Sequence, residues 1–160
     1  MLRVKLNIVI PLLFLLGACS AGVQKDLTTG LTVGNKNLTY EKAYIKKDGV
    51  NMDEPNVNVG AKLQLMMEGV SGFKEENNRA FPGCSILVTD KEGNVEMKYD
   101  DLFEQYNKEG VSPDDVAYLN SSLTIGDPLV AGKTYKWTSR FWDKKGDGEI
   151  TAAIELSVIE

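Results

Sequence analysis

The sequence predicts an all-β protein, an antiparallel β-sandwich of about seven strands with one or two short helical turns in a crossover. Three observations support this fold class. Apolar residues occupy every second position in several segments, glycine-containing turns separate pairs of these segments, and helix signals are confined to short stretches. Only extended backbone gathers alternate residues onto one face, and two such sheets packed face to face bury their apolar sides.

Residues 57–67 show the clearest alternation. The apolar positions are Val57, Val59, Ala61, Leu63, Leu65 and Met67. A helix would scatter these side chains around its circumference, so the spacing predicts one strand with a single buried face.

The C-terminal third repeats the pattern over residues 135–141 and 149–158. Shorter strands are predicted at residues 37–46, 84–89, 94–99 and 120–125. Glycine-containing sequences at residues 90–94 and 143–148 predict hairpin turns.

The strongest helix signal begins at Ser112. This residue is a favoured N-cap, Pro113 follows at the first helical position, and Asp114 and Asp115 place acids in the first turn. We expect one or two turns here, and residues 100–103 are a second candidate start.

The N-terminus carries a targeting signal. Two basic residues precede a mainly apolar run over residues 6–16, which ends in Leu16-Gly17-Ala18-Cys19. This motif resembles the lipobox of bacterial lipoproteins, in which the cysteine thiol accepts the lipid. The resemblance implies a signal peptide over residues 1–18 and a lipid-bearing Cys19. The apolar run is too short for a transmembrane helix, which needs about 20 residues.

Cleavage before Cys19 would leave a flexible tether at residues 19–35 and one domain at residues 36–160. Removing the two basic residues of the signal peptide from the 18 in the chain, against 23 acidic ones, leaves a net charge of −7. This acidity argues against nucleic acid as a partner. The lipid makes the membrane of the cell envelope the implied partner. An aspartate directly after the lipid-bearing cysteine would be an inner-membrane retention signal. Ser20 stands at this position instead, which favours the outer membrane.

Acylation of Cys19 would leave Cys84 as the only thiol, so no intrachain disulfide is expected. Cys84 begins a predicted strand, and the chain contains no histidine that could act as its base. We therefore expect Cys84 to be a buried and unreactive core side chain.

The C-terminal part of the sequence resembles the end of bacterial Ig-like and PKD-like domains. It contains Gly132, Tyr135 and Trp137, a run of alternating residues to Asp143, a glycine hairpin and a closing strand. The resemblance implies that Tyr135 forms the tyrosine corner of such folds. It also implies that Trp137 fills the space that antibody domains give to a core cysteine. An Ig-like fold implies a non-catalytic module, although the fold alone does not specify a ligand.

The hairpin at residues 143–148 partly matches a calcium-binding EF-hand loop. Asp143 and Asp147 stand at the first and fifth positions, but Ile154 stands at the twelfth, where the motif requires glutamate. A charged hairpin tip is the favoured interpretation. A Ca²⁺-dependent adhesive site formed by Asp143, Asp147 and Glu149 is the alternative.

Neighbouring acids leave a carboxylate-based hydrolase as a further alternative. The pairs are Asp100/Asp101, Asp114/Asp115 and Glu75/Glu76. Glycosidase chemistry needs two carboxyl groups facing each other at about 5–9 Å, whereas sequence neighbours point apart. Helix starts and solvated loops are the favoured interpretation of these pairs.

The loop at residues 69–83 is the best candidate for a contact surface, because it is the longest irregular stretch between two predicted strands. Phe73, Arg79 and Phe81 are side chains of the kind that anchor partners. Alternatively, both phenylalanines fold back and cap the sandwich. We expect a non-enzymatic envelope module that needs no cofactor and binds or scaffolds an envelope protein or a surface glycan.

Overall fold

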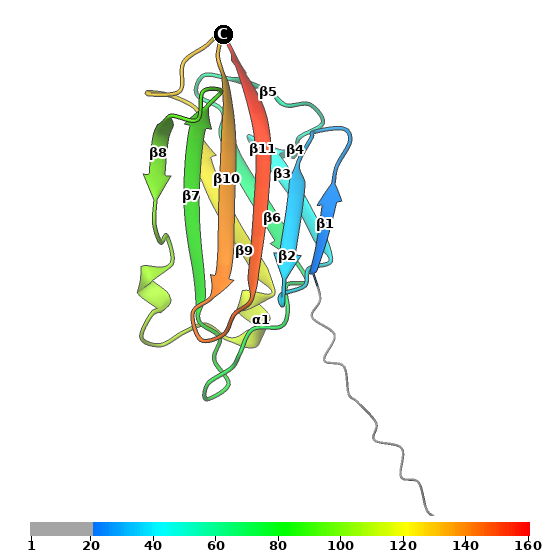
Figure 1. Cartoon of the computed structure of the whole chain (residues 1–160), viewed down its shortest axis with the longest axis vertical. Coiled ribbons are helices and arrows are strands. Elements are labelled where there is room, and N and C mark those ends of the chain that lie inside the picture. The colour runs from blue at the N-terminus through cyan, green and yellow to red at the C-terminus, as the bar shows by residue number, and fades with distance from the viewer. Residues whose placement is uncertain (1–20) are drawn as a thin grey trace, which may run out of the picture.

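The computed structural model describes residues 21–160, which form a sandwich of two β-sheets (Figure 1). The larger sheet contains β1 (Ala21–Lys25), β2 (Thr32–Lys36), β5 (Asn56–Asn58), β7 (Pro82–Asp90), β8 (Val95–Tyr99), β10 (Thr134–Asp143) and β11 (Glu149–Ile159). The smaller sheet contains β3 (Lys42–Lys47), β4 (Val50–Asn51), β6 (Lys62–Glu68) and β9 (Tyr118–Thr124). The predicted all-β sandwich is confirmed, with eleven strands in the described residues instead of about seven.

The strand order follows the Ig pattern. The larger sheet runs β1-β2-β11-β10-β7-β8 and the smaller sheet β4-β3-β6-β9. The run β11-β10-β7-β8 has the neighbours of strands G, F, C and C′ of Ig sandwiches, and β6 beside β9 matches strands B and E. All pairs are antiparallel except that β5 pairs with the end of β11 in parallel.

The core lies between the sheets and is made by alternate residues of the long strands. On β10, Tyr135, Trp137, Ser139 and Phe141 are buried, and the intervening residues face outward. The hydroxyl groups of Ser139 and of Ser121 on β9 lie 2.7 Å apart, so a buried hydrogen bond joins the two sheets. A polar pair is tolerated in the core because each hydroxyl satisfies the other.

Tyr135 forms the hydrogen bond that defines a tyrosine corner. Its hydroxyl oxygen accepts from the backbone N–H of Val130 at 3.0 Å, and the side chain is buried. Trp137 is buried two residues later, as the Ig resemblance implies, and its indole Nε1 has no hydrogen-bond partner within residues 21–160. Packing between the sheets therefore holds Trp137 in place without a polar contact.

The expected flexible tether at residues 19–35 is wrong for its described part. β1 and β2 form an antiparallel hairpin, and β2 pairs with β11. Leu31 and Val33 are each 3% exposed, so this hairpin contributes to the core. The prediction failed because β1 is exposed on both faces and shows no apolar alternation. The signal peptide and Cys19 lie outside the described residues.

The predicted single strand at residues 57–67 is two strands in different sheets. The chain turns at Gly60, which has a φ of +93° that favours glycine, so β5 belongs to the larger sheet and β6 to the smaller one. Val59, expected in the core, is 52% exposed at this turn. The alternation continued through the turn because Val57 and Ala61 enter the same core from two sheets.

The remaining elements have the type predicted from the sequence, but their first and last residues differ from the predicted ones. The strand expected at residues 37–46 starts at Lys42, after a turn in which Asn37 has a φ of 58°. Helix α1 (Pro113–Val116) begins as predicted, with the Ser112 side chain accepting from the amide of Asp115. A 3₁₀ turn at Glu104–Tyr106 follows the second candidate helix start. Among residues 21–160, no helix is long and apolar enough to cross a membrane.

Replacing Tyr135 by phenylalanine removes one buried hydrogen bond and keeps the ring. We expect Tyr135→Phe to lower the free energy of unfolding by about 1 kcal/mol, measured by urea denaturation. Tyr118→Phe is the matched control because Tyr118 is 67% exposed, and it should be neutral. Equal effects of the two substitutions would contradict the tyrosine-corner role.

Candidate functional site

The loop at residues 69–83 folds into a tight hairpin at the lower end of the sandwich in Figure 1. Glu76 and Arg79 exchange backbone hydrogen bonds, and Asn77 and Asn78 between them both have positive φ. Asparagine tolerates this left-handed conformation better than most residues, so the sequence favours a defined turn here.

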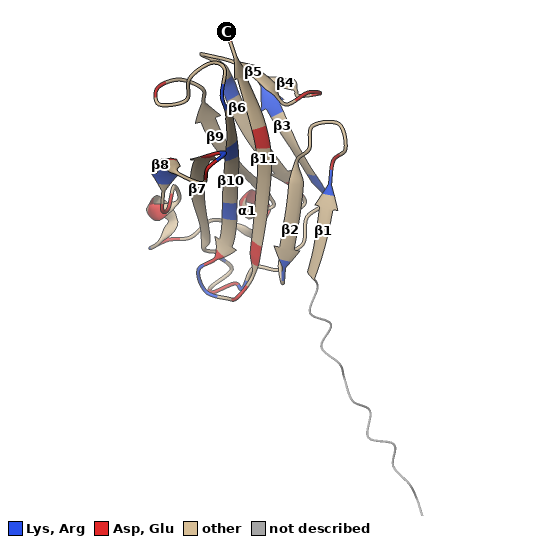
Figure 2. Cartoon of the chain, turned by 45° about the horizontal axis from the view of Figure 1, so that its top comes forward, with Lys and Arg blue, Asp and Glu red and all other residues tan. Residues whose placement is uncertain are grey.

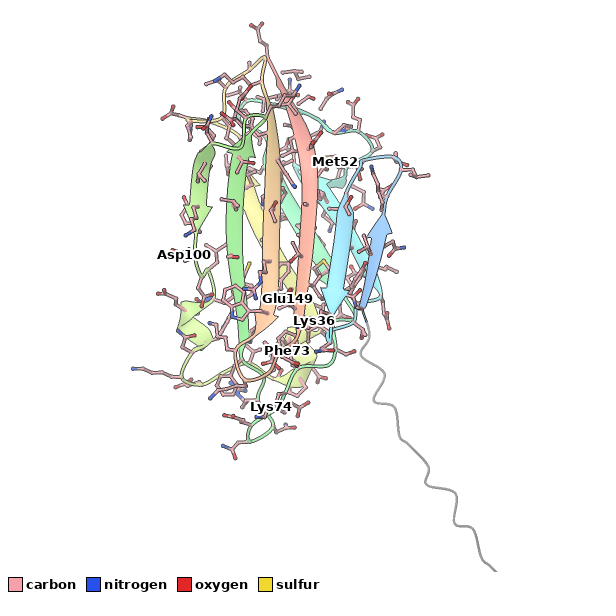
Figure 3. All side chains as sticks on the ribbon, viewed as in Figure 1. Lys36, Met52, Phe73, Lys74, Asp100 and Glu149 are labelled. Atoms are coloured by element: carbon pink, nitrogen blue, oxygen red, sulfur yellow. The ribbon has the colours of Figure 1, made fainter. Side chains whose placement is uncertain are left out.

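The three predicted anchor residues of this loop serve the fold. Phe81 is 8% exposed, with the Lys145 ammonium 4.8 Å from its ring centroid, and Phe73 packs against the core cluster. Arg79 donates to the backbone oxygens of Glu109 and Gly110. Figure 3 shows Phe73 and the neighbouring Lys74 at this end of the sandwich. The structure thus favours the alternative in which the phenylalanines fold back, and Arg79 ties two loops together.

Asp143, Asp147 and Glu149 each have a separate partner. Asp143 is 5% exposed and accepts from the amides of Lys74 and Lys145, at 2.7 and 2.9 Å. Asp147 accepts from Asn37, and Glu149 forms an ion pair with Arg140. No group of three acidic or cysteine side chains in residues 21–160 has a metal-binding arrangement. The carboxylates stabilise the hairpin and are not gathered around a common point.

The acid pairs of the hydrolase alternative are likewise engaged separately. Asp100 pairs with Lys98, Asp101 pairs with Lys144, and Asp115 accepts from Ser112. In the third pair, Glu76 forms an ion pair with Lys145. These contacts hold a strand end, loops and a helix start.

Asp101 and Lys144 form the most enclosed ion pair among the described residues. Lys144 Nζ lies 2.6 Å from Asp101 Oδ2, and both side chains are at most 16% exposed. Burial alone would raise the pKa of Asp101, but Lys144 and the backbone amides of Phe103 and Cys84 outweigh it and hold the pKa below its usual range. This pair fastens the β10–β11 hairpin to the segment that follows β8.

Cys84 lies beside this pair at the start of β7 and is fully buried. Burial, with a smaller contribution from the Asp101 charge, raises the pKa of the Cys84 thiol to about 12. A thiol in this state is protonated near neutral pH, and the thiolate is the reactive form. The expected unreactive core cysteine agrees with this environment.

The larger sheet carries a hollow surface on its outer face that the sequence did not indicate. Two hollows of about 520 and 500 Å³ lie along the β2–β11 pair. Their floor is made of small outward-facing residues of β2 and β11, which are Thr32, Gly34, Thr151 and Ala153. We call this surface the sheet trough. One wall is β1, with Val23 and Lys25. The other is β10, where Lys136 lines a hollow and Arg140 lies beside Thr151 in the register.

The register across the sheet aligns the trough residues in rows. Val23 lies opposite Gly34, Gly34 opposite Thr151, and Thr151 opposite Arg140. The next row along the strands begins at Lys25 and contains Thr32 and Ala153. The two hollows are therefore neighbouring parts of one surface.

Arg140 is fixed in the wall of the trough. Its Nε and Nη2 donate to the same carboxylate oxygen of Glu149 at 2.9 and 2.7 Å, and its guanidinium lies 5.0 Å from the Trp142 ring centroid. Trp142 in turn covers Gly83, where any β-carbon would collide with the indole. Glycine at position 83 thus leaves room for the indole that contacts Arg140.

A third hollow of about 540 Å³ lies on the other side of β1, between β1 and β3. Leu31 and Val33 line it, together with the acids Asp26, Glu41 and Glu68. The hydroxyl of Thr29 and the amide of Thr28 hold the pKa of Asp26 below its usual range, and Glu68 accepts from the Tyr44 hydroxyl. Asp26 is therefore poorly suited to act as a general acid.

The trough was missed because two of its four strands were not recognised as such. β1 and β2 fall in the segment interpreted as a tether, and small residues such as Gly34 and Thr32 gave no strand signal there. The alternation of β10 and β11 could have shown that Lys136, Arg140 and Thr151 share the outer face. It could not show which strand lies beside β11.

Comparison with known proteins gives no relative on which function could be based. No model of a known protein family matches the chain, and no curated protein matches it. The function therefore has to be inferred from the residues of this chain alone.

Acidification tests the Asp101–Lys144 pair. Because the folded pKa of Asp101 is lowered, its stabilising effect is complete above the unfolded value of about 3.9 and is lost as the pH falls through the folded pKa. We expect the urea midpoint of the wild type to fall more between pH 6 and pH 3 than that of Asp101→Asn. Asp100→Asn, at an exposed neighbouring carboxyl, should fall as the wild type does.

Thiol titration tests the environment of Cys84. The native protein should not react with a colourless disulfide reagent at pH 8 and should release one equivalent of chromophore per chain in denaturant, because the native thiol is buried and protonated. Cys19, when acylated, does not contribute. Rapid reaction of the native protein would contradict the burial of Cys84.

Proposed function

We propose that this protein is a lipid-anchored, non-catalytic binding module of the bacterial cell envelope. The observation that carries the proposal is the Leu16-Gly17-Ala18-Cys19 motif, which ends two residues before β1. A cysteine in this motif is the expected lipid acceptor, and everything after Ala21 belongs to one folded domain. The module would lie on the outer membrane by the identity of Ser20.

The short distance between Cys19 and β1 supports a domain held close to the bilayer. Two residues span at most about 7 Å, so the lipid would be attached almost directly to an edge strand. More than one acyl chain is expected on such a cysteine, and each buried CH₂ contributes about 0.8 kcal/mol, which gives a lasting anchor. β1 begins at the lower end of the sandwich in Figure 1, which would therefore lie nearest the membrane.

Binding is supported over catalysis by the state of the polar residues. Most of the acids that sequence analysis singled out have hydrogen-bond or ion-pair roles in the fold, as described above for Asp101 and Asp143, and the cysteine Cys84 is buried. The sheet trough, in contrast, is open to solvent and offers a surface about four strands wide. An envelope protein or a surface glycan is the proposed class of partner.

Metabolic labelling tests the anchor. Cells expressing the full chain and fed labelled palmitate should incorporate label into the protein, and Cys19→Ala should abolish it. Cys84→Ala is the matched control, since it removes the other cysteine of the chain and should keep the label. Label that persists in Cys19→Ala, or is absent from the wild type, would overturn the lipoprotein assignment.

A further inference from the structure

We propose that the sheet trough binds an anionic polysaccharide in extended form; this inference rests on the proposed binding function and names its ligand class. The trough combines two features that suit such a ligand. Its floor is made of small residues, two of which are threonines, and exposed cations lie along its walls.

The floor of the trough fits a linear chain. The hollows of about 520 and 500 Å³ lie end to end along the strand direction. The small residues beneath them are Thr32, Gly34, Thr151 and Ala153. Five residues of β2 span about 17 Å, and the strands from β1 to β10 span about 14 Å, at ordinary strand spacings. A few sugar units fit in this space, and threonine hydroxyl groups can donate to and accept from sugar hydroxyls.

The walls supply positive charge in an acidic domain. Four cationic side chains surround the trough, namely Lys25, Lys36, Lys136 and Arg140, and all four are exposed. The acids on this surface are Glu149, which pairs with Arg140 and lies opposite Lys36 in the register, and Glu155, which lies opposite Lys136. Four cations therefore face two acids. Figure 2 shows blue bands on β10 and blue ends on β1 and β2, with red bands on β11 between them, and Figure 3 places Lys36 next to Glu149.

This local excess of cations contrasts with the net charge of −7 beyond the signal peptide. Most acids lie in turns and at strand ends, so cations outnumber acids on the trough surface although acids outnumber cations in the domain. Clustered charge of one sign in a depression raises the local concentration of oppositely charged ligands. A hollow surface also fits a polymer chain better than it fits the flat surface of a bilayer.

Ligand binding to the lipidated full-length protein in neutral detergent tests the inference. The probe is an oligomer of polygalacturonate, which carries a carboxylate on every sugar, and the neutral comparison is dextran of similar size. Polygalacturonate should bind, with affinity that falls as NaCl rises, and dextran should bind much more weakly. The double variant Lys36→Gln/Lys136→Gln should bind about tenfold more weakly, the equivalent of about 1.4 kcal/mol.

The matched control removes the same charge from the opposite sheet. Lys42 and Lys62 are exposed on β3 and β6, and Lys42→Gln/Lys62→Gln should bind polygalacturonate as the wild type does. A steric variant, Gly34→Leu, fills the floor. A β-carbon at this position meets its nearest neighbours at 3.8 Å, so the fold should be kept while binding is lost. Thermal melting checks that all variants are folded.

The possible results separate this inference from the proposed anchor. Absence of polygalacturonate binding, equal binding of dextran, or equal weakening by both double variants would overturn the trough assignment. Binding to anionic vesicles by the unlipidated mature domain, with none to polygalacturonate, would make a membrane the occupant and overturn it as well. Palmitate labelling of each variant reports on the anchor independently, since none of these substitutions touches Cys19.

Discussion

The structure depends on the alternation of side chains along β10, the strand that β11 and β7 flank over nine paired residues each. Residues facing inward, from Tyr135 to Phe141, pack against the smaller sheet and include the serine that bonds to Ser121. Residues facing outward are then placed by the same backbone geometry, four positions apart for Lys136 and Arg140. The alternation of side chains along β10 therefore places both the core residues and the wall residues of the trough. A register slip of one residue would exchange the two faces and destroy both.

Sequence reasoning succeeded where one face of a strand is buried and failed where none is. β10 and β11 each place apolar side chains on one face, and their hairpin was predicted at the correct residues. β1 has no buried residue, because it pairs with β2 at the sheet edge and both its faces are open. No periodicity can reveal such a strand, and only its pairing partner β2 and the register to β11 define it.

The candidate loop shows a different limit. Phe73, Arg79 and Phe81 have the chemistry of residues that anchor a partner, but that chemistry also anchors one loop to another. Which role applies depends on non-local contacts, since the carbonyl oxygens that Arg79 meets belong to residues 30 positions away. The same holds for Asp143, which accepts from the amide of Lys74, 69 positions away, in addition to the amide of Lys145 in its own hairpin. Residue type and spacing carry no information on such distant partners.

The missing tether changes what an anchor at Cys19 would do. A flexible segment over residues 19–35 would let the domain rotate freely, whereas a lipid attached two residues before β1 would be coupled to one wall of the trough. A domain held this close to the bilayer would have less orientational freedom to lose on binding a ligand. The same short link would oppose any ligand that requires the domain to stand away from the membrane.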